Sequence, residues 1–371
     1  MADAPGPTPM LEYDGHLGAL YRMFLLNILL TILTLGIWRF WAITRYRRYL
    51  WSRMRFQGER FTYTGTGGEL FLGLLLAIAI VAAIGIACSG IGYVLYVIAP
   101  KLRFLAFIPF YLAIVILALG APFSAQRYRL SRTLWCNTRG GMTGSMFAYG
   151  LRALLYVLLI FPTLYQIIPW ITLRLAERRI NASIFGATRF HFTGRAWHIY
   201  PAFLATIALW LISIAAIATL VFLGSQPAIN ALITLLGDGI DASTATLILR
   251  YIGSWIIVGL AAFILISTIL ASWYNAVVAR HIFGNTTLGP LTFASRITGP
   301  RLFILLTGNL LIILCTLGLG WPITIQRDAR FLARNTLATG AITPELLGPS
   351  TLPAPRTGEG MLSLLDGGSA L

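Results

Sequence analysis

The sequence predicts an all-α polytopic membrane protein: a helical bundle with internal repeats, broken or re-entrant helices and short interfacial β-hairpins. Of the 371 residues, 57% are hydrophobic and only 11% are charged, whereas soluble domains carry about a quarter charged residues. Four uninterrupted apolar stretches are long enough to cross a bilayer, and three more are interrupted by polar residues or proline. These observations exclude a water-soluble globular protein.

The four uninterrupted stretches are the predicted membrane-spanning helices. They cover residues 70–99, 104–123, 200–223 and 251–270. The interrupted stretches are residues 23–38, 153–171 and 302–325. They are either full spans, which gives seven passes, or hairpins that enter without crossing, which gives four. We favour four passes, because seven would place two arginine-rich loops outside, against the bias of basic residues toward the cytoplasm.

The interrupted stretches share a register that predicts an internal repeat. Each carries a Thr-Leu pair, at Thr34, Thr163 and Thr316, and an arginine follows each threonine by eleven positions. Asn27 and Asn309 precede their threonines by seven positions. We expect the helices to break at these pairs, and matched broken helices direct their polar groups at one site.

A site of this kind is typical of a transporter or channel. Its predicted polar lining at the membrane midplane is Asn27, Thr34, Thr163, Gln166, Asn309 and Thr316. The same residues also suit a structural role, because Asn and Thr side chains join membrane helices through hydrogen bonds. Both interpretations are open from the sequence.

A second pattern is an arginine, four further residues and a polar residue. It occurs at Arg48, Arg132, Arg178, Arg280 and Arg330. Aromatic residues alternate after two copies, over residues 60–65 and 189–194, which predicts short β-hairpins.

The charge of the chain is dominated by arginine, with 28 Lys and Arg against 12 Asp and Glu. The loops around residues 44–68, 124–152 and 171–199 are arginine-rich, and the loop at Lys101 is sparse, so the arginine-rich loops are expected in the cytoplasm. Contacts to anionic lipid headgroups are expected at Arg45, Arg47, Arg48, Arg132, Arg178, Arg280 and Arg330. A guanidinium presents a planar fork to phosphate, although these arginines could also serve only to set the topology.

The expected partner is thus the bilayer and its anionic lipids. Nucleic acid is not expected, because the arginines lie within a turn or two of apolar segments and meet headgroups first. No catalytic residue, cofactor or metal is predicted, because the four histidines and three cysteines form no recognisable ligand spacing. We therefore expect a protein that is not an enzyme.

The chain resembles the YjgN-like family of bacterial inner-membrane proteins, an uncharacterised family. The resemblance is carried by residues 27–42 (NILLTILTLGIWRFWA), 45–53 (RYRRYLWSR) and 61–70 (FTYTGTGGEL). It is specific over residues 15–75 and extends more weakly to residue 338. It departs at Phe40, where family members usually have proline before the tryptophan. The resemblance implies a multi-pass protein of the bacterial inner membrane and assigns no catalytic residue.

The chain divides into three predicted parts. Residues 1–14 and 339–371 are rich in Pro, Gly, Ser and Thr and are expected to be disordered tails, and residues 15–338 form the membrane domain of repeated helix and basic-motif units. Two functions are compatible with this domain. The first is a transporter or channel for a small or anionic solute, and the alternative is a non-transporting module that binds anionic lipid or partner proteins through its arginine belt.

Overall fold

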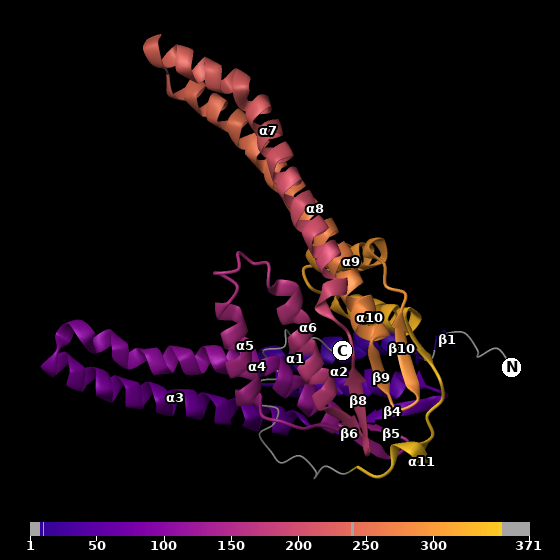
Figure 1. Cartoon of the computed structure of the whole chain (residues 1–371). Coiled ribbons are helices and arrows are strands. Elements are labelled where there is room, and N and C mark those ends of the chain that lie inside the picture. The colour runs from indigo at the N-terminus through magenta and orange to yellow at the C-terminus, as the bar shows by residue number, and fades with distance from the viewer. Residues whose placement is uncertain (1–7, 10, 239–240, 351–371) are drawn as a thin grey trace. The chain divides into compact units, whose positions relative to one another are not determined.

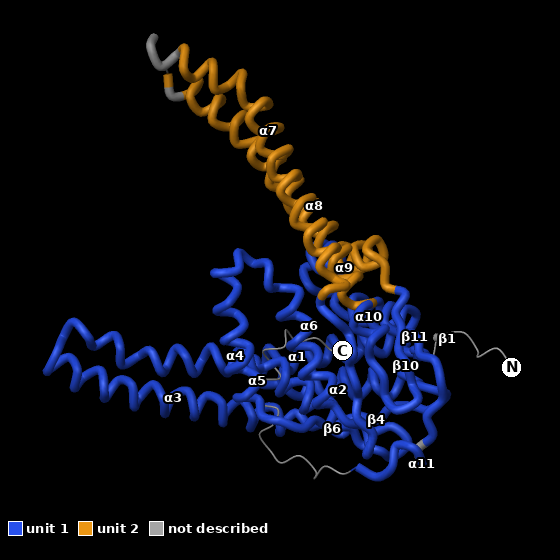
Figure 2. The backbone as a smooth tube through the Cα atoms, in the orientation of Figure 1, with its two compact units in different colours: residues 1–196, 281–296, 309–371 blue, residues 197–280, 297–308 orange. Residues whose placement is uncertain are grey.

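The structure is a computed structural model that describes residues 8–9, 11–238 and 241–350 (Figure 1). The chain forms two compact units, and each is described by itself (Figure 2). The first unit contains residues 1–196, 281–296 and 309–371, and the second contains residues 197–280 and 297–308.

Pairs of helices alternate with pairs of strands along the chain. The α-helices are α1 (Leu17–Leu33), α2 (Arg39–Arg53), α3 (Gly67–Ile98), α4 (Ile108–Ser131), α5 (Met146–Leu158), α6 (Ile168–Ala182), α7 (Tyr200–Asp238), α8 (Ala242–Gly284), α9 (Gly299–Cys315), α10 (Trp321–Asn335) and α11 (Pro344–Leu347). The strands are β1 (Thr8–Pro9), β2 (Leu11–Tyr13), β3 (Met54–Phe56), β4 (Glu59–Tyr63), β5 (Thr133–Trp135), β6 (Thr138–Met142), β7 (Ser183–Phe185), β8 (Thr188–Phe192), β9 (Thr286–Leu288), β10 (Leu291–Ser295) and β11 (Thr336–Thr339). Two 3₁₀-helices are η1 (Pro100–Phe107) and η2 (Ala196–His198).

The eleven described strands form one antiparallel sheet in the first unit, in the order β1-β11-β10-β9-β8-β7-β6-β5-β4-β3-β2. One residue separates the two edge strands, β1 and β2, in the sequence, so the sheet curls until its edges nearly meet, as in a barrel. The prediction of an all-α helical bundle is therefore wrong. The short hairpins do not lie separately at the interface, because each pairs edge to edge with the next, as β4 does with β5.

The hairpins β3–β4 and β5–β6 are formed locally by their turns. The turn residues Gln57 and Gly58 have φ of 51° and 84°, and Cys136 and Asn137 have φ of 48° and 60°. Two-residue turns of this left-handed type match the twist of the strands that they join. The strands on either side can therefore pair directly.

One backbone hydrogen bond recurs at five junctions between helices and sheet. In each case the backbone amide of the residue after a strand donates to a carbonyl at the C-terminal end of the second helix in the following pair. The bonds run from Asp14 to Arg53 (3.1 Å), Thr64 to Arg132 (2.9 Å), Thr143 to Ala182 (2.9 Å), Thr193 to Asn285 (3.0 Å) and Arg296 to Asn335 (2.9 Å). Each pair of helices thus ends at the sheet through the same contact.

The residues after β11 cover the hairpin turns of the sheet. The amide of Ala187 donates to the carbonyl of Leu347 at 2.6 Å, and Nε2 of Gln57 donates to the carbonyl of Gly340 at 3.3 Å. The side chain of Leu347 is fully buried in an apolar cluster that contains Trp135 and Leu288. This segment belongs to the core of the first unit.

The two predicted tails, residues 1–14 and 339–371, contain ordered elements where the structure describes them. Strand β2 lies in the first, and α11 lies in the second. These parts are ordered because they pair with β3 and pack on the hairpin turns. The other parts of the tails, residues 1–7, 10 and 351–371, lie outside the described residues.

Four helices have the length and composition needed to cross a membrane. They are Gly67–Ile98, Pro100–Ser131, Tyr200–Thr234 and Ser243–Gly284, and each overlaps one of the four predicted spans. The first two form an antiparallel pair in the first unit (Figure 1). The other two form a pair in the second unit, where Nε1 of Trp210 donates to Oγ of Ser267 at 3.1 Å.

The three Thr-Leu pairs form turns between shorter helices. These turns join α1 to α2, α5 to α6 and α9 to α10. Leu35, Leu164 and Leu317 adopt left-handed backbone there, with φ of 50°, 47° and 49°. The predicted helix breaks are thus present, and their depth in a membrane stays a prediction.

Candidate functional site

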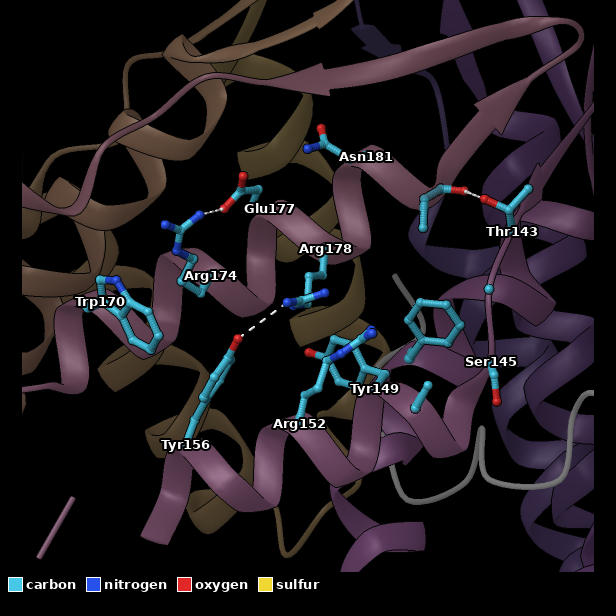
Figure 3. Close-up of a pocket in the computed structure, with 14 residues that line it drawn as sticks. Thr143, Ser145, Tyr149, Arg152, Tyr156, Trp170, Arg174, Glu177, Arg178 and Asn181 are labelled. Atoms are coloured by element: carbon cyan, nitrogen blue, oxygen red, sulfur yellow. Dashed lines mark hydrogen bonds and ion pairs between the residues drawn. The ribbon is translucent and has the colours of Figure 1, made fainter. Parts of the chain in front are cut away.

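A cavity of about 680 Å³ lies between α5 and α6 in the first unit (Figure 3). Its polar and aromatic lining consists of Phe123, Thr143, Ser145, Tyr149, Arg152, Tyr156, Trp170, Arg174, Glu177, Arg178 and Asn181. We call this cavity the α5–α6 groove. Three guanidinium groups and one carboxylate line it, so the groove is positively charged.

The three arginines of the groove are only partly neutralised. Nη1 of Arg174 lies 2.8 Å from Oε2 of Glu177, and Nη2 of Arg178 donates to the hydroxyl of Tyr156 at 3.4 Å. The buried Nε of Arg178 has no hydrogen-bond partner among the described residues. Within the groove, no described residue forms a hydrogen bond or ion pair with the guanidinium of Arg152. Figure 3 shows the side chains of Arg152 and Arg178 extending into the space between the helices.

Helical spacing and aromatic contacts hold these side chains in place. Arg174 and Arg178 are four residues apart, so they share one face of α6. The guanidinium of Arg174 lies 5.6 Å from the ring centre of Trp170, and Trp170 packs edge-on against Tyr156 at 5.0 Å. Burial raises the pKa of Tyr149, so its hydroxyl stays protonated and remains a potential donor.

A second recurring contact, from an arginine near the end of the second helix of a pair to a later backbone carbonyl, is absent from α6. We call this contact the arginine clamp. The residue six positions before the following strand is Arg48, Arg127, Arg280 or Arg330 in four helices and Glu177 in α6. Three of these arginines donate to a carbonyl seventeen residues later: Arg48 to Gly65 (3.2 Å), Arg127 to Gly144 (3.3 Å) and Arg280 to Ile297 (2.5 Å). A carboxylate cannot donate in this way. Glu177 instead pairs with Arg174 in the groove.

A second cavity, of about 320 Å³, lies between Glu177 and Gly194, the positions that correspond to the arginine and the carbonyl of the clamp. Glu177, Arg174 and Trp170 line it together with Gly194, the residue at the end of the hairpin that follows α6. The side chains of α6 therefore separate two cavities within the first unit.

Comparison with known proteins places the chain in a family. Residues 8–364 match the model of a family described as bacterial protein of unknown function, DUF898. The chain belongs to the DUF898 family. No solved structure matches it.

Curated relatives of this DUF898 chain are named inner membrane protein YjgN. The protein from Salmonella typhimurium (strain LT2) is 40% identical over 70 residues, which is 19% of this chain and 18% of the relative. The protein from Escherichia coli (strain K12) is 38% identical over 69 residues, which is 19% of this chain and 17% of the relative. The chain therefore matches less than a fifth of each relative. The resemblance to the YjgN-like family is confirmed.

The DUF898 fold separates the residues predicted to line one polar site. A cavity of about 360 Å³ beside α1 is lined by Asn27 but by none of the other five predicted residues. The buried Asn27 accepts at Oδ1 from Nε1 of Trp38 at 3.1 Å, and Nδ2 of Asn309 donates to Oδ1 of Asp328 at 2.7 Å. Both asparagines thus join the two helices of their own hairpin.

The three threonines bond within their own turns. Oγ1 donates to the carbonyl four residues earlier in all three, at 2.6–2.7 Å. In Thr34 and Thr316 the same oxygen accepts from the amide four residues later. Gln166 is exposed.

The arginines predicted to contact headgroups have different environments. Arg45, Arg48, Arg280 and Arg330 are exposed, and Arg45 lies over the ring of Trp38. The structure shows other contacts at three positions. Arg132 pairs with Glu69 at 2.9 Å, Arg178 lies in the groove, and Arg47 is only 1% exposed. Arg47 therefore cannot reach a headgroup in this conformation.

Sequence reasoning missed Arg127, Arg152 and Arg174 as functional residues and aligned two arginines incorrectly. Arg132 lies one position before its strand and Arg178 five positions before its strand, whereas the other three copies lie six positions before theirs. Counting back from each strand would have found Arg127 and Glu177. That count needs strand positions, which the sequence signals only weakly.

Proposed function

We propose that this chain is a multi-pass inner-membrane protein that binds the phosphate of an anionic lipid headgroup in the α5–α6 groove. The observation that supports this most directly is the incomplete neutralisation of three arginines around one cavity, with a single carboxylate, Glu177. Guanidinium groups bind phosphate through paired hydrogen bonds, and a cavity of this size accommodates a headgroup.

The proposed topology follows from the four long apolar helices. If α3, α4, α7 and α8 cross the membrane, the sparse loop at Lys101 faces the periplasm and the sheet with its arginines faces the cytoplasm. The α5–α6 groove then lies beside the inner leaflet, where anionic headgroups are available.

The repeating element order supports a further proposal about the architecture. We infer that the chain consists of five internal repeats, each a pair of helices followed by strands. The junction contact that recurs from Asp14 to Arg296 supports this, as do the arginines six positions before the strands. In this proposal the third repeat consists of α5, α6, β7 and β8, and it has the groove in place of the arginine clamp.

We propose that the chain binds lipid and neither catalyses a reaction nor transports a solute. Five of the six residues predicted to form a polar midplane site are bonded within their own helical hairpins, and the sixth, Gln166, is exposed. The transporter or channel hypothesis therefore lacks a shared site among the described residues. Nucleic acid and partner proteins have no comparable support.

The test uses full-length protein in nanodiscs that contain phosphatidylglycerol or phosphatidylcholine. Arg152→Gln with Arg174→Gln should weaken retention of phosphatidylglycerol, because each arginine near an anionic surface contributes about 1 kcal/mol, or about thirtyfold in affinity for two. Retention should fall with salt, because ions screen the attraction. Bound lipid is measured by mass spectrometry.

The matched control is Lys101→Gln with Arg103→Gln. It removes the same charge from the exposed loop between the first two long helices. Unchanged lipid retention in the Arg152 and Arg174 variant, or an equal loss in the control, would reject the groove as the binding site.

A further inference from the structure

We propose that the turns of the three short helical hairpins, α1–α2, α5–α6 and α9–α10, insert into one leaflet of the membrane without crossing it. The proposed occupant around each turn is the acyl chains of the cytoplasmic leaflet. This inference concerns the hairpin turns and does not rest on the proposed headgroup site.

The tips of the three hairpins are exposed leucines. Leu35 is 95% exposed, Leu164 is 79% exposed and Leu317 is 93% exposed. Each also has left-handed backbone, which is uncommon for a residue with a branched side chain. Exposing an apolar side chain to water is unfavourable, whereas placing it among acyl chains is favourable. An exposed leucine at all three tips is therefore better explained by a membrane around the turns.

The backbone of two turns is suited to lipid, because its amides are bonded internally. From Thr34 to Arg39 each amide donates within the hairpin: Leu35 to Ile32 (3.2 Å), Gly36 to Thr31 (2.7 Å), Ile37 to Thr34 (3.1 Å) and Trp38 to Thr34 Oγ1 (2.9 Å). The turn at Thr316 has the same set, including Gly320 to Thr316 Oγ1 at 2.7 Å. Lipid offers no donors or acceptors, so internal bonding of this kind stabilises a turn there. The turn at Thr163 has the corresponding backbone bonds from the amides of Leu164, Tyr165 and Gln166.

The threonines make these turns self-sufficient. Oγ1 of Thr34 accepts from an amide that would otherwise need water, and Thr316 does the same. The side chain of Trp38 is also satisfied, because its Nε1 donates to Asn27. These polar residues therefore permit insertion and need not line a path for a solute.

The helices of these hairpins are unsuited to a full crossing. Helix α1 has 17 residues and α5 has 13, or about 26 Å and 20 Å, against about 30 Å of hydrocarbon. The returning helices are basic, and α2 carries five arginines in 15 residues. Arg39 lies four residues after the tip Leu35, so its long side chain must extend toward the headgroups. The other charges of the returning helices lie ten or more residues from the tips and would not enter the hydrocarbon core.

The distance from tip to charge sets the depth. Arg45, Arg174 and Arg327 each follow their tip leucine by ten residues. Ten residues rise at most about 15 Å along a helix, which is half of the hydrocarbon thickness. When these arginines lie at the cytoplasmic headgroups, the tips therefore reach about the middle of the bilayer.

The test places single cysteines in a full-length chain whose Cys88, Cys136 and Cys315 are replaced by serine. Leu35→Cys, Leu164→Cys and Leu317→Cys are exposed to an impermeant maleimide in spheroplasts and in inverted vesicles. They should remain unmodified in both, and nitroxides attached in detergent before reconstitution should be more accessible to oxygen than to a polar nickel chelate.

Two control positions calibrate the two faces. Lys101→Cys lies between the first two long helices and should react only from the periplasm, and Arg189→Cys lies in β8 and should react only from the cytoplasm. Periplasmic modification of the tips would show a full crossing and overturn the proposal. Cytoplasmic modification, or nitroxides shielded from both oxygen and nickel, would place the tips in water or inside protein and overturn it equally.

Discussion

Nη2 of Arg48 donates to the backbone carbonyl of Gly65, 3.2 Å away and seventeen residues further along the chain. Arg48 lies near the end of α2, and Gly65 lies between β4 and α3. The contact therefore ties the second helix of one pair to the start of the next. An arginine that the sequence predicted for headgroups has a structural role.

Arg48→Gln should lower the free energy of unfolding by about 1 kcal/mol, because a charged hydrogen bond at a partly exposed site is lost. Denaturation by sodium dodecyl sulfate, followed by circular dichroism, measures this. The control is Arg22→Gln in α1, where the side chain is exposed, so that this change should leave stability unchanged. Equal stability of both variants would contradict a clamp role for Arg48.

Arg47→Met should maintain or raise stability by about 1 kcal/mol. Arg47 is 1% exposed, and its Nε and Nη1 have no hydrogen-bond partner among the described residues. An apolar chain of similar length avoids the cost of a buried, unsatisfied charge. The same denaturation assay reports the change, and a loss above about 2 kcal/mol would indicate that an unidentified anion compensates Arg47.

Leu347→Ala should lower stability by about 3 kcal/mol, because it leaves a cavity beneath the hairpin turns. Leu347 is fully buried, whereas the neighbouring Leu346 is 61% exposed, so Leu346→Ala is the matched control and should cost little. Comparable stability in the two variants would mean that the segment after β11 does not stabilise the sheet.

The Asp328 carboxyl should make stability depend on pH. Burial raises its pKa, and the hydrogen bond from Asn309 opposes this shift. A raised folded pKa means that the stabilising contribution is complete below the ordinary aspartate range and is lost as pH rises through the folded value. Asn309→Leu should steepen that loss because the carboxylate then lacks its donor.

Asp328→Asn is the control for this prediction. It removes the titrating group, so the difference in melting temperature between pH 4 and pH 7 should shrink relative to the unaltered chain. A pH profile identical in both proteins would show that Asp328 does not titrate differently on folding.

The sequence was sufficient to predict the features that depend on short stretches of chain. Apolar length gave the four long helices, and the Thr-Leu pairs gave the helix breaks, because hydrophobic runs and local turns are encoded within a few residues. The same local signals led to the assignment of an all-α fold. Strands of two to five residues are too short to reveal which edges pair.

The tertiary structure alone decided what depends on distant residues. Phe61 lies opposite Trp135 across two strands, which requires the long pair of helices between them to return to the sheet. The α5–α6 groove likewise depends on Arg152 and Arg178 meeting across a turn, and its asymmetry depends on Glu177 replacing an arginine at a place that only the strands define. The sequence by itself determined where the four long apolar helices lie, where the shorter helices break, and the charge of the chain. Sheet closure and the groove arose from packing between segments whose separation along the chain leaves no local pattern.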